Sequence, residues 1–246
     1  MFHIAHRFAL TFILIASITI LTACGGDGKD SAKKDASTTQ PHSDKPAEKT
    51  TDKPNGSAQA DPNVTKLFDG KTLTNWKVTE FGGQGEVEVK NGELLIHYGE
   101  ILSGVNYTGK LPARMNYEIN LEAKKVDGSD FFCGLTVPVK DKHISLILGG
   151  WGGGVAGLSS LDGTDASENE TTLYQEFETG KWYKVKMQVL PEQINVWLNG
   201  KLVIDVTIKG REVSIRPEVE LSAPFGICTF QTSAAYRNIT FTKLDK

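Results

Sequence analysis

Short runs of alternating or compact apolar residues, each bounded by Gly, Pro, Asn or Asp, dominate the chain from residue 64 onward. Such runs are typical of β-strands, and helical periodicity over a dozen residues is hardly present. Ten or so short strands without intervening helices predict an all-β fold, an antiparallel β-sandwich. The predicted strands are Glu86–Val89, Leu94–Tyr98, Tyr117–Ala123, Phe131–Val137, Ile144–Leu148, Trp182–Leu190, Gln193–Leu198, Leu202–Ile208, Gly226–Thr232 and Arg237–Leu244.

Two dipeptides between these runs predict tight hairpins. Asn91-Gly92 and Asn199-Gly200 each separate two predicted strands. A two-residue type I′ turn needs a positive φ at both central residues, which Asn and Gly adopt readily. We therefore expect antiparallel pairing across both dipeptides.

The alternation within the predicted strand Tyr117–Ala123 indicates which side chains share a face of the sheet. Its apolar side chains point one way, whereas Glu118, Asn120 and Glu122 point the other. The polar row is either a solvated outer face or the lining of a concave sheet that holds a sugar. The sequence alone leaves both interpretations open. If the row lines a saccharide site, we expect Trp151 and the loop of residues 162–170 to border the same site.

The first residues are typical of an export signal. A basic or titratable start is followed by the apolar run Phe8–Leu21, which is interrupted and shorter than the roughly 20 apolar residues of a membrane span. Leu21-Thr22-Ala23-Cys24 resembles the bacterial lipobox, so residues 1–23 are predicted to be a lipoprotein signal peptide and Cys24 the lipidated first residue. Gly25 stands where Asp would signal retention, and this resemblance to the sorting pattern of didermal bacteria favours the outer membrane within the cell envelope.

A polar segment separates this signal from the predicted sandwich. Residues 25–63 contain no aromatic residue and no Leu, Ile, Val or Met. Such a segment cannot bury enough apolar surface to offset the entropy lost on ordering. We therefore predict a disordered tether over residues 24–63 and one domain over residues 64–246.

Charge and cysteine usage exclude several classes. The formal net charge is −3, and removing Arg7 with the signal makes it −4. No basic face with interleaved aromatics is visible, so we expect no nucleic-acid partner and no membrane contact beyond the lipid. Besides Cys24 the chain has only Cys133 and Cys228, which we predict to be free and buried. We expect a monomer.

Motifs along the whole of residues 64–246 resemble the 3-keto-disaccharide hydrolase family. The resemblance implies a concanavalin A-like jelly roll and a carbohydrate ligand. The matching segments are Leu67-Phe68-Asp69-Gly70-Lys71-Thr72-Leu73 followed by Trp76, Asn91-Gly92-Glu93-Leu94, Tyr117–Ala123, Gly180-Lys181-Trp182-Tyr183, Trp197-Leu198-Asn199-Gly200 and Tyr236-Arg237-Asn238-Ile239.

The chain also departs from that family's pattern. Where family members carry an Asn-Ser-Gly-Ile segment, this chain has Ser129–Leu135. The usual Glu-x-Gln strand has no clear counterpart, and the segment Gly149–Gly154, with Trp151 among glycines, stands in its place. The chain is therefore predicted to be a divergent member.

The resemblance implies cleavage of a keto-sugar glycoside. A ketone at sugar C3 acidifies the C2 proton, so the bond at C1 can be lost by elimination, followed by addition of water. This chemistry needs a base near C2, an electrophile or metal at the ketone oxygen, and an acid for the leaving oxygen. Ordinary hydrolysis of a glycosidic bond would instead need a pair of carboxylates. For either route our candidate catalytic residues are Glu118, Glu122, Asp130, His97 and Glu100.

The segment after residue 148 supplies candidates for substrate binding. Trp151 has little neighbouring side chain to cover it, so its indole either stacks on a sugar or folds back onto the core. The acidic loop (residues 162–170) contributes Asp162 and Asn169 as further candidates. That loop could hold a divalent metal ion such as Ca²⁺ through oxygen ligands, or it could simply be solvated. Three other tryptophans, Trp76, Trp182 and Trp197, are predicted to be core residues.

Two classes of function follow. The first is a membrane-tethered extracytoplasmic hydrolase that cleaves glycosidic bonds of keto-sugars or related saccharides. The second is a non-catalytic module on a tether that binds a carbohydrate or another partner. A binding module needs stacking and hydrogen bonds but no base, so the groups beside Trp151 should separate the two.

Overall fold

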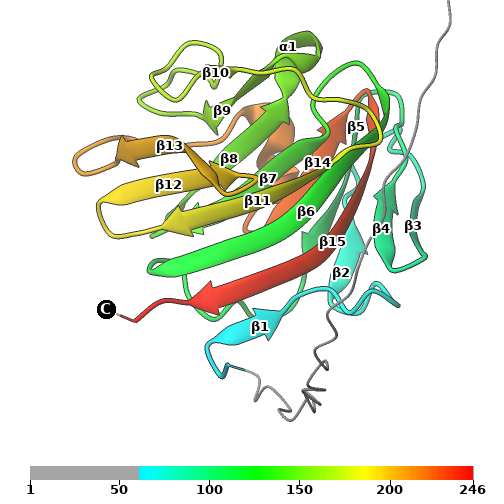
Figure 1. Ribbon diagram of the computed structural model, residues 1–246, viewed down its shortest axis with the longest axis horizontal. Coiled ribbons are helices and arrows are strands. Elements are labelled where there is room, and N and C mark those ends of the chain that lie inside the picture. The colour runs from blue at the N-terminus through cyan, green and yellow to red at the C-terminus, as the bar shows by residue number, and fades with distance from the viewer. Residues whose placement is uncertain (1–60, 246) are drawn as a thin grey trace, which may run out of the picture. The chain divides into compact units, whose positions relative to one another are not determined.

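The computed structural model describes residues 61–245, which form two antiparallel sheets packed face to face (Figure 1). The predicted all-β antiparallel sandwich is confirmed. The eight-stranded sheet has the order β13 (Lys201–Thr207), β12 (Gln193–Leu198), β11 (Trp182–Val189), β6 (Tyr117–Gly128), β15 (Thr232–Lys243), β4 (Glu93–Ile96) and β3 (Val87–Lys90), with β1 (Val64–Lys66) also on β15.

The second sheet and two short helical segments complete the described part of the chain. The seven-stranded sheet has the order β10 (Leu173–Tyr174), β9 (Val155–Ser159), β8 (Lys142–Gly149), β7 (Cys133–Val139), β14 (Gly226–Phe230), β5 (Leu102–Tyr107) and β2 (Trp76–Val78). A single helical turn, α1 (Gly150–Gly153), follows β8, and a 3-10 helix, η1 (Pro217–Ser222), precedes β14. Between residues 61 and 245 no helix is long and apolar enough to span a membrane.

The core lies between the two sheets and follows the alternation of the sequence. Along β6, buried and partly exposed residues alternate from Tyr117 to Lys124, as predicted. Two buried tyrosines tie the sheets together by donating hydrogen bonds across the core. The Tyr117 hydroxyl bonds the carbonyl of Pro138 at 2.6 Å, and the Tyr236 hydroxyl bonds the carbonyl of Phe132 at 2.5 Å.

The two predicted hairpin turns are confirmed. Asn91 and Gly92 have φ values of 53° and 83° between β3 and β4, and Asn199 and Gly200 have 51° and 84° between β12 and β13. Positive φ at both central residues is the geometry that the dipeptides predict. These turns set the register of both hairpins.

Five strands were not predicted, and the reason differs between short and long ones. β1, β2 and β10 have two or three residues, too few to show a pattern. In β5 and β9 nearly every residue is buried, because other segments cover the outer face of the seven-stranded sheet. A strand buried on both faces shows no alternation.

The tryptophan predictions are partly wrong. Trp76 is a core residue, and its indole N–H donates to the carbonyl of Leu67 at 2.9 Å. Trp182 and Trp197 instead lie partly exposed on the outer face of the eight-stranded sheet. Lys186 lies 4.0 Å above the Trp197 ring. The alternation of the sequence could not reveal this exposure, because a cation–π interaction stabilises an indole at a solvent-exposed surface.

Both described cysteines are free and buried, as predicted. Cys133 belongs to the core between the sheets, whereas Cys228 belongs to a small apolar cluster on the outer side of the seven-stranded sheet. Burial raises the pKa of both thiols, that of Cys228 to about 12. Both therefore remain protonated and behave as small apolar side chains.

The predicted signal peptide, the lipidated Cys24 and the tether up to residue 60 lie outside the described residues. The last three residues of the predicted tether, 61–63, are among the described residues. Asn63 accepts a hydrogen bond of 2.9 Å from the backbone N–H of Lys243, and Val64 begins β1.

Candidate functional site

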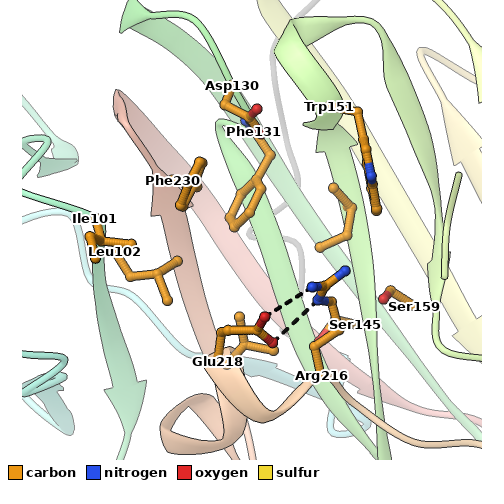
Figure 2. Close-up of a pocket in the computed structure, with 12 residues that line it drawn as sticks. Ile101, Leu102, Asp130, Phe131, Ser145, Trp151, Ser159, Arg216, Glu218 and Phe230 are labelled. Carbon is orange, nitrogen blue, oxygen red and sulfur yellow. Dashed lines mark hydrogen bonds and ion pairs between the residues drawn. The ribbon is translucent and has the colours of Figure 1, made fainter. Parts of the chain in front are cut away.

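A hollow of about 280 Å³ opens on the outer face of the seven-stranded sheet (Figure 2). Its floor includes Ser145 and Ile147 of β8 and Ser159 of β9. The register pairs Ser145 with Ser159, and the two hydroxyl-bearing residues therefore lie side by side. The Ser145 hydroxyl shares a hydrogen bond of 2.8 Å with that of Thr136 on β7. Small side chains in the floor leave room above the sheet.

The glycine-rich turn between β8 and β9 forms one wall and carries Trp151. Trp151 has φ 51° and ψ 53°, the left-handed conformation, and its neighbour Gly152 has φ 81°. A left-handed backbone costs a residue with a Cβ roughly 1–2 kcal/mol. The side chain is 44 % exposed and lines the hollow. The structure thus favours an accessible indole over one folded back onto the core.

Asp130 holds this turn in place. One carboxylate oxygen accepts the backbone N–H of Gly152 at 2.8 Å, and the other accepts that of Phe131 at 2.8 Å. Asp130 also lines the hollow. Two sequence-predicted site residues, Asp130 and Trp151, are therefore brought together, and Asp130 positions the backbone on which the indole is carried.

A strap (residues 211–222) crosses the outer face of the seven-stranded sheet and supplies the charged groups. Ser160 and Ser214 exchange backbone hydrogen bonds of 2.8 and 3.1 Å, which fix the strap beside β9. Arg216 of the strap forms an ion pair with Glu218 at 2.9 Å and another with Asp165 of the acidic loop. Figure 2 shows the Arg216 guanidinium facing the Glu218 carboxylate at one end of the hollow.

The ionisation of this group is fixed by its contacts. The hydrogen bond from Arg216 lowers the pKa of Glu218, and Glu218 together with Asp165 raises the pKa of Arg216. Asp165 also accepts hydrogen bonds of 3.0 Å from the hydroxyls of Ser159 and Ser160. The hollow therefore presents a fixed cation flanked by carboxylates at neutral pH.

The opposite side of the hollow is apolar. Phe131 and Phe230 stack with ring centroids 5.9 Å apart and an interplanar angle of 25°. Ile101 and Leu102, at the start of β5, line the hollow beside them. The register pairs Phe230 with Leu102, which brings their side chains to the same face of the sheet.

The other predicted substrate-binding residues, Asp162 and Asn169, make hydrogen bonds that hold the acidic loop in place. Asp162 accepts hydrogen bonds from the backbone N–H of Glu212 at 2.8 Å and from Arg211 at 2.7 Å, and these lower its pKa. The buried Asn169 amide donates to the carbonyls of Leu158 and Asp165, both at 2.8 Å. Neither residue lines the hollow.

Two predicted catalytic residues, Glu118 and Glu122, lie on the outer face of the other sheet. Glu122 accepts hydrogen bonds from Arg237 at 2.8 Å and Asn238 at 3.1 Å. Burial alone would raise the pKa of Glu122, but these bonds outweigh it and lower the pKa. Glu118 accepts a hydrogen bond of 2.8 Å from Gln188. The predicted grouping of this polar row with Trp151 is wrong, because the two belong to different sheets.

The remaining candidates, His97 and Glu100, follow β4 and are partly or fully exposed. His97 pairs with Glu88 at 3.2 Å, and Glu100 donates its backbone N–H to the carbonyl of Gly83 at 2.8 Å. Neither lines the hollow. Within residues 61–245 no group of three His, Cys, Asp or Glu side chains is placed to hold a metal ion. Arginines pair with three of the four carboxylates of the acidic loop, those of Asp162, Asp165 and Glu170.

Sequence reasoning missed Arg216, Glu218, Phe131, Phe230 and the two floor serines. One signal was available: residues 209–225 separate two predicted strands by a longer stretch than a hairpin needs. Connections longer than about 12–15 residues without their own strands or helices are frequently functional. No local pattern marks the aromatic pair, because its members lie about a hundred residues apart.

The fold defines a class, the β-sandwich proteins of galectin-like and concanavalin A-like architecture. The chain belongs to the family of 3-keto-alpha-glucoside-1,2-lyase-like domains, whose model matches residues 63–242. No curated protein matches the chain.

Solved structures resemble this one in fold. A protein of unknown function with a galectin-like fold from Bacillus subtilis aligns with a TM-score of 0.52 and 8 % identity, over 73 % of this chain and 94 % of that one. The apo form of Crh5 transglycosylase aligns with a TM-score of 0.52 and 9 % identity, over 74 % of this chain and 84 % of that one. A structure reported with endo-acting O-glycanases of the human gut microbiota aligns with a TM-score of 0.50 and 13 % identity, over 74 % of this chain and 98 % of that one.

Proposed function

We propose that the hollow binds a saccharide and that the protein cleaves 3-keto-α-glucosides. The observation that carries this proposal is the accessible indole of Trp151 above a hollow that also presents the Arg216–Glu218 pair. An exposed indole can stack on a pyranose ring while a few charged groups orient its oxygens. Membership of the 3-keto-alpha-glucoside-1,2-lyase-like family supports the same substrate class.

Elimination from a 3-keto-glucoside requires an electrophile at the ketone oxygen and a base at C2. We assign Arg216 to the ketone oxygen, where its guanidinium would stabilise the negative charge that develops. Glu218 would accept the C2 proton; the C2–H electrons form the C1–C2 double bond, and the aglycone leaves with the C1–O electrons and takes up a proton from water. Hydration of that double bond would then complete a hydrolysis.

A turnover assay tests this proposal. The full chain, purified in detergent, would be incubated with methyl 3-keto-α-D-glucopyranoside, and released methanol would be measured. We expect Glu218→Gln to lower kcat about 100-fold or more, since that is the usual contribution of a general base. The matched control is Glu192→Gln, an exposed carboxylate in the turn between β11 and β12 of the other sheet, paired with Lys209 at 2.8 Å. Equal losses in both variants would contradict the assignment.

A second function is favoured by a specific observation. Both carboxylates that line the hollow are already bonded, Asp130 to two backbone N–H groups and Glu218 to Arg216. Such an arrangement also suits a binding module, which needs no base. Saccharide binding without turnover of any 3-keto-glucoside would favour this second function.

We also propose that the domain works in the cell envelope, anchored by a lipid on Cys24. The support is the lipobox at the end of the apolar run and the polar composition of the segment that follows it. Two or three acyl chains anchor a protein durably. A tethered domain would meet saccharides that reach the membrane surface.

A further inference from the structure

The hollow is divided into a polar and an apolar half. Figure 2 shows Trp151 and Ser159 on one side, Ile101, Leu102 and Phe230 on the other, and Phe131 between them. The polar half carries the Trp151 indole, the Ser159 hydroxyl and the Arg216 guanidinium, and Glu218 faces Arg216 from the other side at one end of the hollow. The apolar half is left without a role in that proposal.

The apolar half is a cluster separate from the core between the sheets. Leu102 and Val219 are buried and pack with Cys228, and the partly buried rings of Phe131 and Phe230 adjoin them. Ile101 stands at the rim and is 55 % exposed. A large, exposed aliphatic side chain next to stacked rings at the edge of a hollow is typical of a surface that an apolar ligand covers.

A second sugar ring would fit this half poorly. None of the side chains Ile101, Leu102, Phe131, Val219 and Phe230 carries a hydrogen-bonding group, whereas a sugar has a hydroxyl on most of its carbons. Sugar hydroxyls that lose water there without a partner would cost roughly 1–3 kcal/mol each. The apolar half therefore favours an apolar group over a second sugar ring.

We propose that the ligand is a glycoside with an apolar aglycone, aromatic or alkyl, which occupies the Ile101 side while the sugar stacks on Trp151. This inference rests on the proposed function and names its substrate class. The volume of about 280 Å³ lies at the lower end of the roughly 300–1,000 Å³ of small-ligand pockets. One pyranose ring with a small aglycone suits that volume better than an oligosaccharide.

The test compares methyl α-D-glucopyranoside with benzyl α-D-glucopyranoside, which share the sugar and lack the 3-keto group that elimination requires. Their affinities for the full chain would be measured by isothermal titration calorimetry. Covering a benzyl group removes roughly 100 Å² of apolar surface from water. At about 25 cal/mol per Å² this corresponds to roughly 60-fold tighter binding. We expect the benzyl glucoside to bind at least about tenfold tighter, since the hollow is open on one side.

Matched variants locate the effect. Ile101→Asn should reduce the benzyl preference to about threefold or less, because it places an amide at the rim of the apolar half. The control Leu202→Asn changes an aliphatic residue that is 43 % exposed on β13 of the other sheet and should leave the preference unchanged. Both substitutions are at exposed positions, and circular dichroism would verify folding.

Each result has a defined meaning. Equal affinity for the two glucosides, with turnover of the 3-keto substrate intact, overturns the aglycone assignment and leaves the proposed function standing. Benzyl alcohol alone binding as tightly as the benzyl glucoside overturns it too, because the sugar then contributes nothing. Binding of neither glucoside overturns this inference whatever the turnover, and absence of turnover as well removes the proposed catalysis.

Discussion

Trp151 offers the sharpest test of the saccharide site, because its indole should determine ligand affinity whereas its left-handed backbone should determine stability. The side chain is 44 % exposed, which for an indole of up to ~250 Å² leaves roughly 110 Å² accessible. A sugar ring that covers half of this area would gain about 1.4 kcal/mol, or roughly tenfold in affinity. We therefore expect Trp151→Ala and Trp151→Gly each to weaken binding of benzyl α-D-glucopyranoside about tenfold.

The same two variants should differ in stability. Both lose the packing of the indole, so the difference between them isolates the backbone, whose φ at Trp151 is 51°. Glycine adopts this conformation without steric cost, so the Gly variant should be about 1 kcal/mol more stable than the Ala variant. At ordinary positions in strands and helices the order is reversed by roughly 0.5–1 kcal/mol.

Urea unfolding and calorimetry measure the two effects separately. Tyr174→Ala is the matched control, an aromatic residue that is 78 % exposed on β10 and does not line the hollow. An Ala variant of Trp151 as stable as the Gly variant would refute the strain argument. Unchanged affinity in both, with a ligand that the parent protein binds, would refute the stacking argument.

Three further predictions concern other parts of the chain. Tyr236→Phe should destabilise the protein by about 1–2 kcal/mol in urea unfolding, because the buried carbonyl of Phe132 loses its donor; no loss would show that water replaces it. Arg216 lowers the pKa of Glu218 below its ordinary 4.5, so the pair stabilises the fold above that pH and the contribution is lost as pH falls through the lowered pKa. The Tm difference between the parent and Glu218→Gln should therefore shrink from about pH 5 to about pH 3, and a constant difference would contradict this. Cys24→Ser should release the protein from the membrane fraction, and full retention with an intact signal would exclude lipid anchoring.

The sequence by itself determined the architecture and several local details. Period-two alternation from Tyr117 to Ala123 assigned one face of β6 to the core, and Asn91-Gly92 set a hairpin turn. These features depend on neighbours within a few residues, so a local pattern can encode them. The free state of the two cysteines followed for a similar reason, since each lies within an apolar run beside other apolar residues.

Only the tertiary structure decided where the candidate site lies. The hollow joins the Trp151 turn, the strap at Arg216 and the ring of Phe230, which come from separate parts of the chain and meet on one face of one sheet. The sequence shows that Glu122 points away from the core but not which sheet it belongs to. The order of the strands decides to which sheet Glu122 belongs. That order depends on pairing between distant segments, which a local sequence pattern does not encode.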